Sequence, residues 1–428
     1  MTERTKELAL AATQAQSAAL NADSAAPSAF GLSLPASVLN IEDKCRSNLF
    51  PWRGQFSPQL VETLLRVYAA PGSVVLDPFM GSGTVLVEAA RLGLSAYGYE
   101  VNPAAYLLAR VYELCSLTTE ERRELLQKAD AVLTWLRPSA FELPLFRTSQ
   151  VDTPPPGNDL SWLKAPHDLR VRMLLEAFVV LVDGDTASDQ SYSKTWSTIR
   201  EVVTDLPFSR TPVRAVLGDA RALHLADGSI DFVLSSPPYI NVFNYHHNSR
   251  TAVESLGWKP LVVARSEIGS NRKFRQNRFL TVVQYCIDMA LALAELRRVC
   301  NASARILLIL GRESNIHKTA FYNSSIIERL ATEIVGLRLH LRQERRFLNR
   351  FGQRIYEDLL HLSLQPGCFR PTEEIVERAR FLGKDFLSEA AERVPGDRRH
   401  YLREAIAEAG RVEASPIFDP SAAIGDTP

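Results

Sequence analysis

Two adjacent prolines between a serine and a tyrosine form the segment SPPY at residues 236–239, which Ser235 separates from the apolar run 232–234. Each proline fixes its own φ and restricts the residue before it, so the carbonyls of Ser236 and Pro237 point in preset directions. Two fixed acceptors aimed at one exocyclic amino nitrogen would localise its lone pair without a strong base. Tyr239 would stack on the ring that carries the amine. A proline turn with a core tyrosine is the competing interpretation.

A second candidate group lies in the earlier segment DPFMGSGT, residues 77–84, which follows the apolar run 73–76. Asp77 ends that run, and Gly81 and Gly83 let the backbone approach a ligand closely where a helix begins. The spacing matches neither GxGxxG nor GxxxxGK[ST], because Thr84 follows Gly83 directly and no lysine is present. A phosphate-binding loop is therefore disfavoured.

Two further acidic residues come just after apolar runs. Glu100 follows residues 96–99 and can accept hydrogen bonds from two ribose hydroxyls, while Asp219 follows residues 213–217 and suits an adenine amino group. A ribose-bearing ligand without a required diphosphate fits S-adenosylmethionine. Any one of these acids alone could be a cap or turn former, but three at successive strand ends favour a ligand site.

The elements that must position these residues are short strands alternating with helices. Amphipathic spacing predicts a helix in FSPQLVETLLRVY, residues 56–68, and further helices alternate with the apolar runs. This alternation predicts an α/β fold, a doubly wound and mostly parallel sheet of the Rossmann-like type with helices on both faces. The expected strands cover residues 73–76, 96–99, 213–217, 232–234, 306–310 and 359–364.

The pattern along the chain divides it into five segments. We expect a mobile tail rich in Ala, Ser, Thr and Gln over residues 1–38 and the cofactor half of the sheet domain over 39–117. A helical insertion, interrupted by DTPPPGND, covers 118–210. The catalytic half of the sheet domain covers 211–365, and a helical extension covers 366–428.

Composition excludes several classes of protein. The 428 residues are 46% hydrophobic and 23% charged, which is globular usage, and the net charge is zero, so a polyanionic partner must meet local charge clusters. Five scattered cysteines predict neither a disulfide framework nor a zinc site. We find no secretory signal and no apolar run of about 18 residues, so a cytoplasmic location without membrane contact is expected.

Together, these motifs resemble those of the DNA amino-methyltransferases, which methylate cytosine N4 or adenine N6 with S-adenosylmethionine. DPFMGSGT is similar to the family's cofactor motif and SPPY to its catalytic motif, while FSPQL at 56–60 resembles the segment that reaches the methionine end of the cofactor. The resemblance covers roughly residues 50–110 and 213–364. Here the cofactor motif precedes SPPY, whereas the opposite order is frequent, so the position of the target-recognition region stays open.

This resemblance implies a flipped-out nucleotide whose amine is presented by SPPY. Serine at position 236 favours cytosine N4, with adenine N6, or a guanine amine in RNA, as alternatives; a non-catalytic DNA-binding protein on the same fold is the interpretation from another class. A restriction or defence component is a possible partner. The candidate catalytic residues are Ser236, Pro237, Pro238 and Tyr239. The candidate cofactor residues are Phe56, Ser57, Asp77, Phe79, Gly81, Ser82, Gly83, Thr84, Glu100, Asn102 and Asp219.

Two basic clusters suit a DNA backbone, with solvated helix faces as the competing interpretation. One lies in residues 265–278 and the other in residues 338–354, and both contain interleaved phenylalanines. The candidate DNA contacts are Arg272, Lys273, Arg275, Arg278, Arg345, Arg346 and Arg350. Arg312 and Glu313 are candidates either for a substrate contact or for an ion pair. For His246 and His247 we favour contact with the base or the DNA backbone over binding of a metal.

Overall fold

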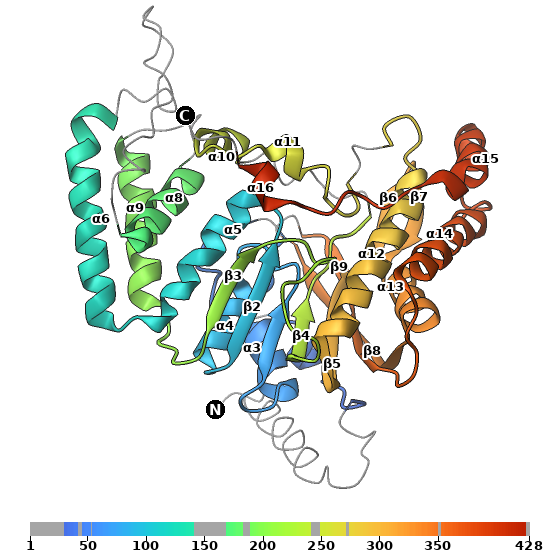
Figure 1. The fold of residues 1–428 in the computed structure, drawn as a ribbon, viewed down its shortest axis with the longest axis horizontal. Coiled ribbons are helices and arrows are strands. Elements are labelled where there is room, and N and C mark those ends of the chain that lie inside the picture. The colour runs from blue at the N-terminus through green and yellow to red at the C-terminus, as the bar shows by residue number, and fades with distance from the viewer. Residues whose placement is uncertain are drawn as a thin grey trace, which may run out of the picture.

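A seven-stranded sheet forms the centre of the computed structural model, which describes residues 30–41, 45–52, 54–140, 168–182, 189–240, 249–270, 274–349 and 352–424 (Figure 1). The strand order is β3-β2-β1-β4-β5-β9-β8. Strands β1 to β5 run parallel, and β9 is antiparallel to both neighbours. Their bounds are β1 Val74–Asp77, β2 Ser95–Glu100, β3 Val213–Leu217, β4 Ile230–Ser235, β5 Cys300–Gly311, β8 Leu337–Leu348 and β9 Arg354–Leu364. The predicted mostly parallel α/β sheet is confirmed.

Alternating side chains of the strands fill two cores, one on each face of the sheet. On β1, Val75 belongs to the first core and Leu76 to the second, and Phe232 and Val233 divide in the same way on β4. The first core lies under α3 Pro58–Tyr68, α4 Thr84–Arg91 and α5 Pro103–Arg110. The second lies under α12 Leu280–Val299, α13 Asn323–Arg329 and the π-helix η4 Leu330–Val335. The sheet is therefore doubly wound.

Helix α3 shows why these segments fold as they do. Ser57 precedes Pro58, and a proline at the first position of a helix costs no internal hydrogen bond. Leu60, Leu64 and Leu65 then share one buried face. This face packs against α4, which places the residues before α3 next to the glycine turn that begins α4.

Three helices occupy the stretch from 118 to 210. Helices α6 Thr119–Ala140, α8 Leu169–Leu181 and α9 Asp189–Asp205 pack on one another, and α8 also packs on α5 (Figure 1). Buried Arg122 fixes the start of α6, because its guanidinium donates to the carbonyls of Leu114 and Pro207. This helical group sits beside the β3 edge of the sheet, and its limits as an insertion stay a prediction.

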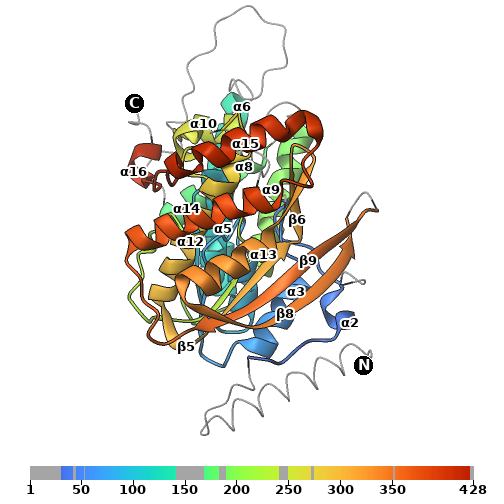
Figure 2. The ribbon, with the colours of Figure 1, turned by 90° about the vertical axis from the view of Figure 1, so that its right-hand side faces the viewer.

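The C-terminal helices belong to the second core. In Figure 2, α14 Thr372–Glu389 lies over α12, and α15 Arg399–Glu408 packs on α14; Leu382 and Phe386 of α14 are in the same cluster of buried side chains as α12. At the other end of the chain, Leu34 and Val38 are buried against the first core. Residues 30–38 therefore do not form the expected mobile tail, since they contribute apolar side chains to the core.

The remaining elements are short. They are α2 Ala36–Leu39, η1 Val111–Ser116, α10 Arg250–Ser255, α11 Pro260–Val263, the hairpin of β6 Glu313–Ile316 and β7 Thr319–Tyr322, η5 Gly396–Arg398, η6 Ala409–Arg411 and α16 Pro420–Ala423. The five cysteines are free thiols. Across the described part of the chain, no helix is both long enough and apolar enough to cross a membrane.

Candidate active site

A cavity of about 900 Å³ opens where β1, β2, β3 and β4 end. It is the place where open α/β sheets bind ligands. Its lining brings together almost all candidate cofactor and catalytic residues, namely Phe56, Ser57, Asp77, Phe79, Gly81, Ser82, Thr84, Glu100, Asn102, Asp219, Ser236, Pro237, Pro238 and Tyr239. Of the predicted set, only Gly83 is absent from this lining. We call this space the active-site cavity.

Asp77 is a buried carboxyl group at the end of β1. One of its oxygens, Oδ1, accepts hydrogen bonds from the Ser235 hydroxyl at 2.6 Å and from the Phe79 N–H at 3.1 Å. Burial raises the pKa of Asp77 to about 7, although both hydrogen bonds lower it, and nearby Glu100 raises it further. Asp77 therefore has an unusually high affinity for a proton, and a cation bound beside it would displace that proton.

The glycine turn after β1 is held by the neighbouring strand. Gly81 donates its N–H to Glu100 Oε2 at 2.9 Å, which ties the turn to the end of β2. Gly83 is required for a different reason, because its φ is +87° and a Cβ there would come within 2.9 Å of the Tyr112 ring. Gly83 thus shapes the start of α4 and does not line the cavity.

Glu100 and Asn102 shape the next strand end. Glu100 Oε1 accepts the Asn102 N–H at 2.8 Å, so each carboxylate oxygen holds one backbone donor. Carboxylate oxygens are hydrogen-bond acceptors, so the chemistry of this strand end suits hydroxyl donors. The Asn102 side chain caps α5 by accepting from the N–H groups of Ala104 and Ala105.

Sequence reasoning missed the loop before α3. Gln55 donates to Ser82 Oγ and to the Phe50 carbonyl at 2.8 Å, and its Oε1 accepts from Asn48 at 2.8 Å. Trp52 lines the cavity and lies beside Gly81. The loop therefore covers the glycine turn. The only signal of this loop in the sequence was that Trp52 and Gln55 lie close to FSPQL, and this combination matches no motif with a known function.

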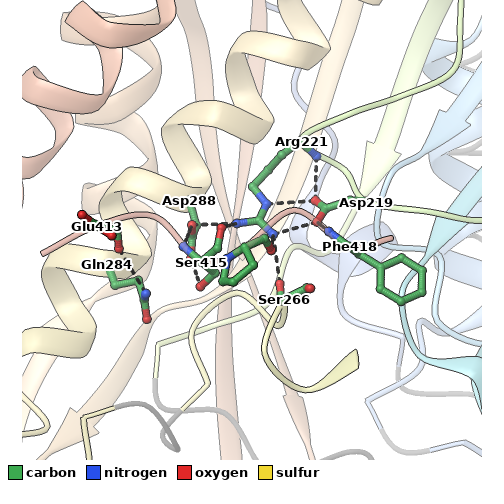
Figure 3. A network of polar contacts seen from close by, with 9 residues as sticks. Asp219, Arg221, Ser266, Gln284, Asp288, Glu413, Ser415 and Phe418 are labelled. Carbon is green, nitrogen blue, oxygen red and sulfur yellow. Dashed lines mark hydrogen bonds and ion pairs between the residues drawn. The ribbon is translucent and has the colours of Figure 1, made fainter. Parts of the chain in front are cut away.

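Asp219 lies at the cavity but is engaged by the protein. Its Oδ1 accepts the N–H and the Nε–H of Arg221, both at 2.9 Å, and its Oδ2 accepts from Arg221 NH2 at 2.7 Å and the Phe418 N–H at 2.9 Å (Figure 3). These four bonds use all four acceptor positions of a carboxylate. The contacts do not support the prediction that Asp219 receives the adenine amino group.

Contacts with Tyr285 and Gly311 hold the SPPY segment in place. Tyr285 donates its hydroxyl to the Pro238 carbonyl at 3.0 Å, and burial raises the pKa of Tyr285, which keeps that hydroxyl protonated. The hydroxyls of Ser236 and Tyr239 lie 3.4 Å apart. The Tyr239 ring packs on Gly311 at the end of β5, where an added Cβ would come within 2.9 Å of it. The ring position thus depends on a glycine.

Replacing Gly311 by alanine should displace the Tyr239 ring. A misplacement of about 1 Å can cost about a hundredfold in rate, so we expect Gly311→Ala to lower kcat by roughly ten- to a hundredfold. Cofactor affinity should change less than threefold, because Gly311 does not line the cavity. Steady-state kinetics and calorimetry measure the two effects. Gly396→Ala is the control, since nothing lies within 4 Å of its added Cβ; a wild-type kcat for Gly311→Ala would contradict the expectation.

The basic candidates separate into three groups. Arg272, Lys273 and Arg350 lie outside the described residues, as do His246 and His247. Arg275, Arg278 and Arg346 are exposed. Arg345 is instead buried in a 2.7 Å ion pair with Glu357, and both residues line the cavity. Its expected place on an exposed DNA-binding face is therefore corrected, because the β8–β9 hairpin turns this side chain inward.

Arg312 also forms ion pairs. It pairs with Glu344 and, at 3.4 Å, with Asp358. Of the two interpretations of Arg312, the ion pair is the one observed, and Glu313 is exposed on β6. Within the described ranges, no group of three or more histidine, cysteine, aspartate and glutamate side chains is arranged to hold a metal ion.

The strand order, the glycine turn after β1 and the acid at the end of β2 together define a Rossmann-like fold of the class I methyltransferase type. Comparison with known proteins points the same way. Residues 32–110 match the family model of the N6 and N4 amino-methylating DNA methylases. These residues contain the cofactor motif, Glu100 and Asn102.

Two curated relatives are type II methyltransferases by name. The chain is 41% identical over 63 residues to the type II methyltransferase M.MjaII of Methanocaldococcus jannaschii, covering 15% of this chain and 12% of the relative. It is 29% identical over 96 residues to the type II methyltransferase M.BsoBI of Geobacillus stearothermophilus, covering 22% and 18%. The chain thus spans under a fifth of either relative's length. The similarity to methyltransferases of this kind is thus shown for part of the chain.

Solved structures with a similar fold are more distant. A S-adenosylmethionine-dependent methyltransferase from Methanosarcina mazei is 13% identical, with a TM-score of 0.33 over 71% of this chain and 97% of the other. The rRNA methyltransferase aviRa from Streptomyces viridochromogenes is 14% identical, with a TM-score of 0.31 over 77% and 91%. Both TM-scores are low, so the fold assignment rests on the strand order described above.

Proposed function

We propose that this protein is a site-specific DNA methyltransferase that moves a methyl group from S-adenosylmethionine to the exocyclic N4 of a flipped-out cytosine. One observation carries the proposal: a single cavity is lined both by the DPFMGSGT turn and by SPPY, which are 152 residues apart when counted from Thr84 to Ser236. Its volume of about 900 Å³ is in the range of cofactor pockets, which reach roughly 1,000 Å³.

The residues at the cofactor end fit S-adenosylmethionine chemically. The cofactor supplies a methyl group on a positively charged sulfur, together with a ribose and an ammonium group. Glu100 offers carboxylate oxygens for the ribose hydroxyls, and Asp77 offers an anionic partner for the positive end. Phe56 and Ser57 line the same cavity beside the turn. Gly81, Ser82 and Thr84 complete this end, with Gly83 setting their conformation.

The residues at the catalytic end fit an aromatic amine. The carbonyls of Ser236 and Pro237 hold the two amine hydrogens and favour a tetrahedral nitrogen, while Tyr239 stacks on the base. The new N–C bond forms as the S–C bond breaks, which leaves S-adenosylhomocysteine as the neutral thioether, and the methylated amine releases one proton to water. Pro238 keeps the elbow rigid, since its carbonyl is held by Tyr285.

The identity of the methylated base is the most informative test. DNA incubated with the protein and S-adenosylmethionine is digested to nucleosides and identified by mass, and we expect N4-methylcytosine because Ser236 begins the SPPY tetrapeptide. Only N6-methyladenine in the digest would overturn the choice of base. RNA run in parallel tests the guanine alternative.

DNA is the proposed partner. The exposed arginines Arg275, Arg278 and Arg346 suit phosphate contacts, which make affinity fall as salt rises. The unmatched remainder of the chain leaves room for target recognition, and a restriction or defence component is proposed as a second partner in the cytoplasm. A non-catalytic DNA-binding role would be favoured if the protein bound the cofactor yet transferred no labelled methyl to any DNA.

A further inference from the structure

A segment near the C-terminus, residues 412–418, crosses the end of β3 behind the wall of the active-site cavity, where it contacts the cavity-lining Asp219; we call it the strap. Figure 3 shows it passing between α12 and the strand ends. The Val412 carbonyl accepts from Arg380 at 2.8 Å, and the Glu413 carbonyl accepts from Gln284 at 3.2 Å. The strap is thus held at its start by α14 and α12.

Arg221 joins the strap to the cavity. Its guanidinium is fully buried between Asp219 at 2.7 Å and Asp288 at 2.8 Å. It also donates to the Ser415 carbonyl at 2.9 Å, the Pro416 carbonyl at 2.9 Å and the Ser266 carbonyl at 3.1 Å. All five N–H donors of an arginine side chain are used in this way. A buried cation so completely bonded holds its partners in one arrangement.

Both carboxylates at Arg221 hold the strap as well. Asp288 accepts the N–H of Ser415 at 2.8 Å and its hydroxyl at 2.7 Å. Asp219 accepts the Phe418 N–H at 2.9 Å. The two carboxylates therefore connect the strap to α12 and to the end of β3.

Phe418 packs behind the wall of the cavity. Its buried ring packs in a small cluster with Val263 and Ala423, against Val101 and Leu217. Val101 separates Glu100 from Asn102 and lines the cavity, and Leu217 is the last residue of β3. The strap therefore supports the two strand ends where the ribose and adenine of the cofactor are expected.

We propose that Arg221 is a positioning residue that fixes the strap against the ends of β2 and β3, and that Asp219 anchors this strap and does not receive the adenine amino group. The inference rests on the proposed function for the identity of the ligand. Its structural half, that Arg221 holds the strap, stands without any ligand.

The structural half is tested by amide hydrogen exchange on the full chain. Arg221→Lys keeps the charge but loses the planar fork that reaches two carboxylates and three carbonyls. We expect exchange at Ser415 and Phe418 to rise at least about tenfold, a change of roughly 1.4 kcal/mol in opening free energy. Arg298→Lys is the matched control, because Arg298 also donates to backbone carbonyls, those of Leu223 and Leu225, but not to the strap. Unchanged protection in Arg221→Lys would overturn the inference.

The ligand half is tested with two forms of S-adenosylhomocysteine, one intact and one lacking the 6-amino group of adenine. We expect Asp219→Asn to weaken binding of both forms about equally, so their ratio of Kd stays within about twofold of the wild-type ratio. If the ratio of the two Kd values falls to about one in Asp219→Asn while exchange at Phe418 is unchanged, Asp219 binds the amino group and the inference is wrong.

Two further measurements separate the anchoring role of Arg221 from the proposed function. Ser415→Ala removes only the hydroxyl bond to Asp288 and keeps both ion pairs of Arg221, so it is the milder variant. We expect raised exchange at Phe418, with cofactor affinity lowered less than in Arg221→Lys. If the wild-type protein binds neither nucleoside form, the proposed function fails. The exchange result still decides the anchoring role of Arg221 in that case.

Discussion

Replacing Tyr239 by alanine should lower methyl transfer by up to about a hundredfold while cofactor affinity changes less than about threefold. Stacking of a base on an aromatic side chain contributes about 1–3 kcal/mol, which is up to roughly two orders of magnitude in rate when the base must be held for reaction. The ring also fixes the position of the base relative to the Ser236 and Pro237 carbonyls. Single-turnover transfer of labelled methyl measures the first effect, and calorimetry with S-adenosylhomocysteine measures the second.

Tyr239→Phe is the matched control for this experiment. It keeps the ring and its packing on Gly311, and loses only the hydroxyl that lies 3.4 Å from Ser236 Oγ. We therefore expect transfer within about fivefold of wild type, because a weak hydrogen bond at this distance contributes about 1 kcal/mol or less. Equal loss of transfer and of cofactor binding in Tyr239→Ala would instead make the residue structural.

Cofactor affinity should rise about tenfold between pH 5.5 and 7, with release of one proton on binding. In the free protein, burial raises the pKa of Asp77 to about 7, so the group is mostly protonated at pH 5.5. A cationic ligand beside Asp77 favours the ionised form, and binding therefore strengthens as pH rises toward that pKa. Calorimetry in buffers of different ionisation enthalpy reports both the affinity and the proton.

Asp77→Asn should bind S-adenosylmethionine at least about tenfold more weakly at pH 7 and show little pH dependence, because the titrating group and its charge are gone. The same substitution changes stability with the opposite pH trend. The folded pKa of Asp77 lies above its ordinary value of 3.8, so its contribution to the free energy of unfolding is complete below about pH 4 and is lost as pH rises through about 7. Urea unfolding at pH 5 and pH 7.5 checks this slope, and an Asp77→Asn variant with the wild-type pH dependence would assign the titration to another group.

Local sequence patterns were enough to predict the fold and most of the residues that line the cavity. Short apolar runs ended by Asp77, Glu100 and Asp219 predict parallel strands, and parallel strands bring their carboxyl ends to one edge of a sheet. SPPY follows a fourth such run, so its position at the same edge followed from the same pattern. The loop at Trp52 and Gln55 escaped prediction, since its contacts with the glycine turn depend on folding of an irregular segment.

The residue types and their spacing were sufficient to determine which strand ends carry candidate catalytic or binding residues. The reason is that the hydrophobic period and the turn residues are local properties of the sequence. Only the tertiary structure decided what each charged side chain faces. Arg345 belongs to a basic cluster in sequence but points inward to Glu357, and Asp219 is bonded to Arg221 and to Phe418, which is 199 residues further along the chain. The physical reason is that a buried charge must find its partners, and those partners come from segments that sequence distance does not relate.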